Sequence, residues 1–259
     1  MTTTSSAATG IEHLWIEDAG AGPPVLLVHG LGGTSTYYEP LARRLLDSHR
    51  VIRFDLAGHG RSGLAGTPSI GSWTAEAIAV LDSLGVDQAS LVGHSMGTLV
   101  AQLLAATHPE RIDKLLLLGP VRAQTEAAKA ATRERAAKVR SEGMRAVADG
   151  IVAASLSPTV AAEHPEVIGF VRELLLGQDP EGYALACEAL ADAEGTDPST
   201  VQAEALLITG TDDGVSPPDS VRGLAAAMPK ARAEVLGACG HWTALERRAE
   251  VNDLVAQFF

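Results

Sequence analysis

GHSMG, residues 93–97, is the stretch that decides how this chain folds. It follows the apolar run 89–92, which is typical of a buried strand, and it precedes the apolar run 98–106, which is typical of a helix. A sharp turn from a strand into a helix needs small residues on both sides of its central residue, where side chains would collide with the tightly folded backbone. The pattern therefore predicts a strand, a tight turn centred on Ser95, and a helix.

Ser95 stands at this turn in a position suited to acyl transfer. The turn lifts its hydroxyl clear of the sheet and places it at the N-terminus of the following helix. There the backbone N–H of Met96 can face the negative charge that develops on a carbonyl oxygen under attack. The competing interpretation is a glycine-rich turn that happens to contain serine, so the rest of the chain has to decide between the two.

The composition limits the fold and the partners. The chain has 259 residues, of which 46% are hydrophobic and 20% charged, and this predicts one large α/β domain with an insertion. The formal net charge of −12 leaves no basic stripe to neutralise nucleic-acid phosphates, and it repels anionic membrane surfaces. We therefore expect no nucleic-acid partner and no membrane partner, and an anionic substrate would need a local cation.

The N-terminal segment and the cysteines bear on localisation. Residues 1–10 are polar and rich in Thr and Ser, and we expect a flexible lead-in that lacks the parts of a secretory signal. No apolar stretch approaches the length that crosses a bilayer. Cys187 and Cys239 lie far apart in sequence and form no metal or redox motif. These features predict a cytoplasmic protein without a disulfide framework and without a metal site.

Strand and helix patterns alternate along most of the chain. Runs with helical spacing at 37–46 and 73–84 lie between short apolar runs, and the strands expected from those runs are 11–16, 25–28, 51–54, 89–92, 114–118, 205–209 and 233–236. This alternation predicts an α/β fold with a mostly parallel sheet flanked by helices. We assign residues 11–120 and 195–259 to this core, with a last helix over 250–259.

Residues 121–194 interrupt the alternation. They contain helical pieces and no convincing buried strand, so we expect a helical cap inserted into the core. The first piece covers residues 123–141. Later pieces begin at Ser157-Pro158 and Asp179-Pro180, where the first residue can cap free N–H groups and proline fits the first helical position.

Two loops supply partners for Ser95. A serine hydroxyl is a weak nucleophile, so it needs a histidine base and a carboxylate that orients the histidine. Asp212 and Asp213 follow the expected strand 205–209, and His241 follows the last expected strand. Because open parallel sheets place their sites beyond the carboxyl ends of the strands, we expect these side chains to meet.

Several separate motifs carry a resemblance to the α/β-hydrolase fold superfamily, over nearly the whole chain after the lead-in. Ser, Asp and His follow one another in the superfamily's order. HGLGG at 29–33 resembles its oxyanion loop, and DLAGHGRS at 55–62 resembles a structural loop that borders its site. The resemblance implies the fold predicted above and a hydrolase whose nucleophile is Ser95.

The same resemblance implies roles for particular residues. The N–H groups of Leu31 and Met96 would form the oxyanion hole. The superfamily pattern G-x-x-D-x-x-x-P fits Gly210, Asp213 and Pro217, which makes Asp213 the expected acid and Asp212 the fallback. His29 and His94 lie inside the motifs, and in most members of the superfamily such histidines make structural hydrogen bonds.

The substrate is suggested by the segment 179–190, the short cap and the compact length. These look most like 3-oxoadipate enol-lactonases and related lactonases and carboxylesterases. The resemblance implies that a small-molecule lactone or carboxylic ester is hydrolysed through an acyl-enzyme without a cofactor. The enol-lactone of that group is an anion, so Arg122, at the start of the cap, is either its anchor or a member of a surface ion pair. Trp242, beside the expected base, is the second predicted substrate contact.

Other interpretations use the same residues differently. A cofactor-free perhydrolase or a C–C bond hydrolase would use the same triad, whereas a small-ligand receptor of this fold would show little turnover. GHGRSG at 58–63 also matches the dinucleotide motif G-x-G-x-x-G. The residues that follow, LAGTP at 64–68, predict a loop and not the helix that would receive a pyrophosphate. We therefore expect no nicotinamide cofactor.

Overall fold

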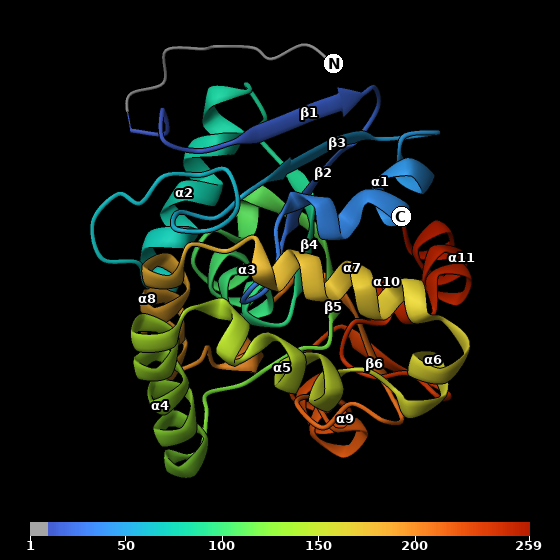
Figure 1. The fold of residues 1–259 in the computed structure, drawn as a ribbon. Coiled ribbons are helices and arrows are strands. Elements are labelled where there is room, and N and C mark those ends of the chain that lie inside the picture. The colour runs from blue at the N-terminus through green and yellow to red at the C-terminus, as the bar shows by residue number, and fades with distance from the viewer. Residues whose placement is uncertain (1–9) are drawn as a thin grey trace.

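A seven-stranded sheet forms the centre of the molecule (Figure 1). The structure is a computed structural model that describes residues 10–259. Every neighbouring pair of strands is parallel except β1 with β3, which confirms the predicted mostly parallel sheet. In spatial order the strands are β1 (Ile16–Gly20), β3 (Arg50–Phe54), β2 (Pro24–Val28), β4 (Ala89–His94), β5 (Ile112–Leu118), β6 (Glu204–Gly210) and β7 (Ala231–Leu236).

The parallel register carries one row of side chains across the central strands. Leu27 of β2 pairs with Val92 of β4, Val92 pairs with Leu116 of β5, and Leu116 pairs with Leu206 of β6. Their neighbours along each strand point to the opposite face, because side chains alternate along a strand. Since helices cover both faces, the central strands are apolar on both, and this explains their continuous apolar sequences.

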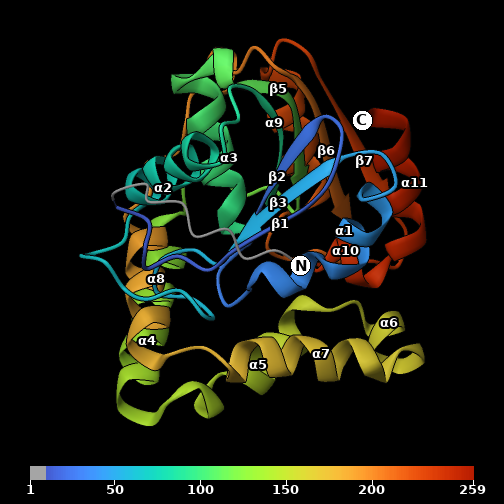
Figure 2. The same ribbon diagram turned by 90° about the horizontal axis from the view of Figure 1, so that it is seen from above.

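Helices cover the two faces of the sheet (Figures 1 and 2). On one face, the side chains of α2 (Ile70–Ser83), α3 (Met96–Thr107) and α9 (Pro218–Ala227) share a buried cluster with the strands. On the other face, α1 (Glu39–Leu45) and α11 (Arg248–Phe258) join a second cluster. The short helix α10 (Thr243–Glu246) precedes α11.

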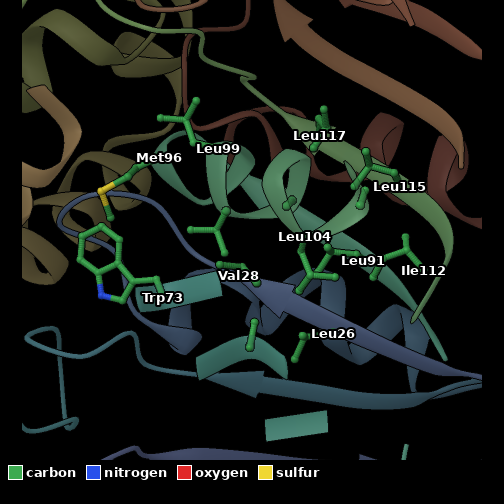
Figure 3. Packing of buried hydrophobic residues seen from close by; sticks show 14 of the residues in the cluster. Leu26, Val28, Trp73, Leu91, Met96, Leu99, Leu104, Ile112, Leu115 and Leu117 are labelled. Carbon is green, nitrogen blue, oxygen red and sulfur yellow. The ribbon is translucent and has the colours of Figure 1, made fainter. Parts of the chain in front are cut away.

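The core between the sheet and helices α2 and α3 supports the turn at Ser95. Its side chains are mainly aliphatic, with the fully buried indole of Trp73 at one end (Figure 3). Met96, the residue after Ser95, is itself fully buried in this cluster. The first turn of α3 is therefore packed against the sheet by its own apolar residues. Members of the cluster that Figure 3 labels include Val28, Leu91, Leu99, Leu104, Leu115 and Leu117.

The chain between β5 and β6 is helical. Two of the helices begin where the sequence predicts them: Ser157 and Asp179 are the N-cap residues, and the Asp179 carboxylate accepts a hydrogen bond from Gly182 N (2.8 Å). In Figure 2, α4 and α8 lie at one end of the segment, and α5 and α7 lie side by side. The helices are α4 (Glu126–Glu142), α5 (Ala148–Ser155), α6 (Pro158–Glu163), α7 (Pro165–Leu176) and α8 (Pro180–Ala191).

The strand expected at 11–16 is wrong. Residues 12–13 form a turn instead, and β1 begins only at Ile16. The segment before β1 lies against the loop 55–62, since Trp15 N donates to Ser62 Oγ (2.8 Å) and the Trp15 ring lies 4.1 Å from the guanidinium of Arg61. β1 is an antiparallel edge strand with charged residues, and its Asp18 pairs with Arg50 of β3 (2.7 Å), so the apolar pattern did not mark it.

Two further expectations concern the N-terminal residues 1–10 and segments that could cross a membrane. Apart from Gly10, the lead-in expected at residues 1–10 lies outside the described residues. No helix within the described part of the chain is long and apolar enough to cross a membrane.

Candidate active site

Ser95 occupies a strained backbone turn between β4 and α3. Its φ of 51° and ψ of −122° lie in a region that residues with a side chain rarely adopt. Two close approaches make the flanking glycines necessary. A methyl group at Gly93 would lie 2.6 Å from the carbonyl oxygen of Gly97, and one at Gly97 would overlap the carbonyl oxygen of Val28. The local sequence therefore produces the turn, and the turn presents a partly exposed Ser95 hydroxyl.

The structure brings Ser95, His241 and Asp213 into one hydrogen-bonded chain. The Oγ of Ser95 lies 2.7 Å from Nε2 of His241. On the other side of the ring, Nδ1 of His241 lies 2.9 Å and 3.1 Å from the two carboxylate oxygens of Asp213. A carboxylate in that position holds Nδ1 protonated, so that Nε2 can accept the proton of the serine hydroxyl.

Asp213 is buried and kept ionised by its surroundings. Burial acts to raise its pKa, but the neighbouring His241 and the N–H groups of Ser216 and Val215 lower the pKa below the usual value for aspartate. Those two N–H groups donate to Oδ1 at 2.8 Å and 2.9 Å. The adjacent Asp212 is exposed and faces elsewhere, since it accepts a hydrogen bond from Ser157 Oγ (2.7 Å).

The loop that contains Leu31 lies against Ser95. A methyl group at Gly30 would be 2.7 Å from Cβ of Ser95, so only glycine permits this approach. Within residues 10–259, the backbone N–H groups of Leu31 and Met96 donate to no protein acceptor. Two free donors beside a serine hydroxyl are what an oxyanion hole requires.

His29, in the same loop as Leu31, is hydrogen-bonded to the loop 55–62. Nε2 of the buried His29 accepts a hydrogen bond from Leu56 N (3.0 Å). In the same loop, the Asp55 carboxylate accepts hydrogen bonds from Ser35 N (2.7 Å) and Arg61 N (2.9 Å). The hydrogen bond from Leu56 N to His29 thus joins the two sequence motifs, 29–33 and 55–62.

His241 is also held through its backbone. Its N–H donates to the carbonyl of Ser155, at the end of α5 (2.8 Å), and its own carbonyl lies 3.0 Å from Nε2 of His94. Burial, together with the nearby His241, lowers the pKa of His94 to about 3, so the His94 ring is neutral and donates from Nε2. His94 therefore makes the kind of structural hydrogen bond that the sequence resemblance implies for it.

Glu246 is a residue of this site that the sequence motifs did not indicate. Its buried carboxylate accepts hydrogen bonds from the N–H groups of Gly240 (2.9 Å) and Trp242 (2.9 Å), on the two sides of His241. It accepts a third from Ser157 N (2.8 Å), in the segment before α6. The one available signal was a carboxylate within the otherwise uncharged stretch 240–246, which is weak by itself.

In this structure, the two residues predicted to contact the substrate have other surroundings. Trp242 is buried, and its indole N–H donates to Ser155 Oγ (2.9 Å). Arg122 is exposed and lines a cavity together with Gln102 and Glu194, and no triad residue lines that cavity. Their roles in substrate binding stay predictions, and the contacts seen here are structural for Trp242 and peripheral for Arg122.

Comparisons with known proteins point to one family. The sequence profile of the alpha/beta hydrolase fold family matches residues 23–247. The 2-hydroxymuconate semialdehyde hydrolase of Pseudomonas putida is 34% identical over 255 residues, which covers 94% of this chain and 89% of that protein. The 3-oxoadipate enol-lactonase 2 of Acinetobacter baylyi is 30% identical over 196 residues, which covers 75% of this chain and 73% of that protein.

A solved structure agrees with the sequence relatives. The thermophilic esterase of Thermogutta terrifontis superimposes with a TM-score of 0.90 at 29% identity, and the match covers 94% of this chain and 92% of that one. These three proteins are a lactonase, an esterase and a hydrolase of a semialdehyde. Together with the profile match over most of its length, they establish that this chain belongs to the alpha/beta hydrolase fold family.

Proposed function

We propose that this protein is a serine hydrolase that cleaves a lactone or a carboxylic ester of a small molecule through an acyl-enzyme. The observation that carries the proposal is the hydrogen-bonded chain from Asp213 through His241 to Ser95. The enol-lactonase and esterase relatives support the same class of substrate. No cofactor takes part in the proposed reaction.

Each residue has a defined task in the proposed reaction. His241 takes the proton of Ser95 through Nε2 while Oγ attacks the substrate carbonyl. The N–H groups of Leu31 and Met96 stabilise the resulting oxyanion, and Asp213 stabilises the imidazolium. His241 then protonates the leaving oxygen, which breaks the ester bond and leaves the acyl group on Ser95. Water, activated by His241, releases the acid and restores the serine.

We further propose that α4–α8 form a cap over this site. The hydrogen bond from His241 N to Ser155 O and the contact of Ser157 N with Glu246 support the proposal, because both join the helical segment to the loop of the base. A cap that touches the base would exclude water when it closes on a substrate. Free thiols at Cys187 and Cys239 support a cytoplasmic location for this chemistry.

The decisive test replaces the nucleophile and its acid separately. Ser95→Ala should lower kcat on lactones and short-chain esters by about 10⁴-fold or more, and a fluorophosphonate reagent should label the parent protein but not this variant. Asp213→Asn should cost about 10³- to 10⁴-fold in kcat, because the asparagine amide would favour the wrong tautomer of His241.

Asp212→Asn is the matched control for the acid. It removes the same charge one residue away and should leave kcat close to that of the parent protein, because Asp212 faces Ser157. Steady turnover on the ester panel separates an enzyme from a receptor of this fold. Turnover that survives Ser95→Ala, or a larger loss in Asp212→Asn than in Asp213→Asn, would contradict the assignment.

Hydrolysis of a C–C bond is the second candidate. The 34% identity to a 2-hydroxymuconate semialdehyde hydrolase, over 94% of this chain, favours it. Ser95, with His241 as its base, would attack an aldehyde or ketone carbonyl. The C–C bond would break with its electron pair on the leaving carbon, to which His241 returns the serine proton, and water would then release the acyl group from Ser95 as an acid. Comparing kcat/KM for 2-hydroxymuconate semialdehyde with that for the lactone and ester panel, with product masses, decides between the two reactions.

A further inference from the structure

Gln178 is a buried amide in the short joint between α7 and α8. Its Oε1 accepts a hydrogen bond from Gly60 N (3.3 Å), in the loop 55–62. Its Nε2 donates to Leu174 O (2.9 Å), near the end of α7. An amide nitrogen carries two N–H donors, so one N–H of Nε2 remains for another acceptor.

This second N–H of Gln178 reaches the oxyanion loop, residues 29–33. Nε2 lies 3.3 Å from Gly32 O and 3.4 Å from Gly33 O. Both distances are at the long end of the hydrogen-bond range, as expected when one N–H is shared between two carbonyl oxygens. Within residues 10–259, Gln178 is the only side chain from outside this loop that hydrogen-bonds to the carbonyls of the loop.

Two peptide groups connect Gln178 to the proposed oxyanion donor. Gly32 O belongs to the same peptide group as Gly33 N–H, and that N–H donates to Gly30 O (3.0 Å). Gly30 O in turn belongs to the same peptide group as Leu31 N–H. Since a peptide group is planar, a rotation that moves its carbonyl also moves its N–H. The hydrogen bond from Gln178 therefore acts on the direction of Leu31 N–H.

The oxyanion loop is restrained from the core as well. Nδ1 of His29 donates to Gly30 O (2.9 Å), because Nε2 of the same ring accepts the hydrogen bond from Leu56 N. The loop thus has one polar restraint from the core, through His29, and one from the helical segment, through Gln178. Removing the second should loosen the loop without releasing it.

Apolar contacts from the same two helices meet the loop at Gly32. A methyl group there would lie 2.5 Å from Cδ2 of Leu175, on α7, and 3.2 Å from Cε2 of Tyr183, on α8. Gly32 is also the residue whose carbonyl faces Gln178. Any movement of α7 and α8 would therefore change the packing and the hydrogen bonding of the loop together.

We infer that Gln178 is a positioning residue for the oxyanion hole, through which the placement of α7 and α8 sets the direction of Leu31 N–H. The inference rests on the proposed hydrolysis through Ser95. Gln178 acts on the reaction through the oxyanion loop, and the hole is complete only when both helices lie as they do here. A shift of the joint that admits a substrate would withdraw the amide, and its return would restore the hole.

Gln178→Met tests the inference, since it keeps the length of the side chain and removes both of its polar atoms. With 4-nitrophenyl butyrate as substrate it should lower kcat about 10- to 100-fold with little change in KM, because a misdirected oxyanion donor costs less than a missing one. Gln124→Met is the matched control. The Gln124 amide donates to Thr132 Oγ1 (3.2 Å) of α4 and to no residue of the loop 29–33, so kcat should stay unchanged.

Two inhibitors separate an effect on the oxyanion hole from a general loss of structure. Propyl trifluoromethyl ketone adds to Ser95 and forms a hemiketal whose oxyanion occupies the hole, whereas the corresponding carbinol cannot add. In Gln178→Met the Ki of the ketone should rise by about the factor by which kcat/KM falls, and the Ki of the carbinol should change less than about twofold. Equal changes for both inhibitors, or an unchanged Ki of the ketone, would overturn the inference.

Gln178→Glu serves if the methionine variant does not fold. It keeps an acceptor for Gly60 N and turns a carboxylate oxygen toward Gly32 O, so the same selective loss of ketone affinity is expected, and parent-like affinity would contradict the inference. Failure of the hydrolase proposal looks different, because no ester would then show Ser95-dependent turnover. In that event hydrogen exchange of the Gly33 amide, followed by NMR, decides. It should quicken about 10-fold in either variant of Gln178, and equal rates would refute the inference.

Discussion

His241 depends on its backbone contacts as much as on its ring contacts. Its ring must stay within hydrogen-bond distance of both Ser95 and Asp213, and a loop residue can do so only when its main chain is fixed. Glu246 provides that restraint from both sides, through Gly240 N and Trp242 N. We therefore regard Glu246 as a positioning residue, which acts on the reaction only through His241.

Glu246→Gln should lower kcat about 10- to 100-fold with little change in KM, because a glutamine has one acceptor oxygen for three N–H groups and the loop of His241 will shift. Steady-state kinetics measures the effect. Glu250→Gln is the control, because it makes the same replacement at an exposed residue of α11, and it should leave kcat unchanged. An unchanged kcat in Glu246→Gln would show that the loop is held without this carboxylate.

Glu246→Gln should also change how the free energy of unfolding depends on pH. Burial, with a contribution from Asp213, raises the pKa of Glu246 above 4.5, although the three N–H groups act to lower it. Its contribution to stability is therefore complete below pH 4.5 and is lost as the pH rises through the folded-state pKa. Urea unfolding at a series of pH values above 4.5 should show this decline in the parent protein and not in Glu246→Gln.

At the scale of elements, α8 connects the helical segment to the core. It lies against the loop 55–62 at Gly182, where a methyl group would overlap the carbonyl oxygen of Gly58. The same helix carries Tyr183 onto the oxyanion loop. By contrast, the exposed ion pairs of Arg140 with Glu181 and Glu188 contribute little, because water screens them. Close backbone packing, and not surface charge, sets the position of α8.

Gly182→Ala should destabilise the protein by about 1–3 kcal/mol, because the added methyl forces α8 away from the loop 55–62. Gly169→Ala in α7 is the matched control, since no atom lies within 4 Å of the position that its Cβ would take. It should be neutral or stabilising by about 0.5–1 kcal/mol. Denaturant unfolding of the two variants measures the difference. Equal free energies of unfolding would show that α8 can yield without cost.

At the scale of the whole molecule, the formal net charge of −12 opposes the approach of an anionic substrate. Salt shortens the range of this repulsion, from about 30 Å at 0.01 M to about 10 Å at 0.1 M. Over that range kcat/KM for the 4-nitrophenyl monoester of glutarate, which carries a carboxylate, should rise by about twofold or more, while kcat/KM for a neutral 4-nitrophenyl ester of equal carbon number stays level. A fall with salt for the anionic ester would mean that a positive charge near the site outweighs the net charge.

Much of the fold was predictable because its signals are local. The buried strands are short apolar runs, and the turn at Ser95 follows from the glycines at 93 and 97, whose missing side chains leave room for backbone contacts. β1 was not predicted, because it is an edge strand. Its Asp18 forms an ion pair with Arg50, so the strand lacks a continuous apolar pattern. The helix starts at Ser157-Pro158 and Asp179-Pro180 were predictable because proline fits the first helical position in both. Only Asp179 also caps its helix with its side chain, since the Ser157 hydroxyl donates to Asp212 instead.

What the sequence by itself determined is the order of the parts along the chain: the glycine-rich loop 29–33, the serine turn 93–97, and then an acid and a histidine after later strands. These follow from spacing within short segments. Only the tertiary structure decided which of two adjacent aspartates faces His241, that Glu246 holds the loop of His241, and that Arg122 lines a cavity to which no triad residue contributes. The physical reason is that these contacts join residues far apart in the chain, and their geometry depends on how helices pack and rotate, which no local pattern records.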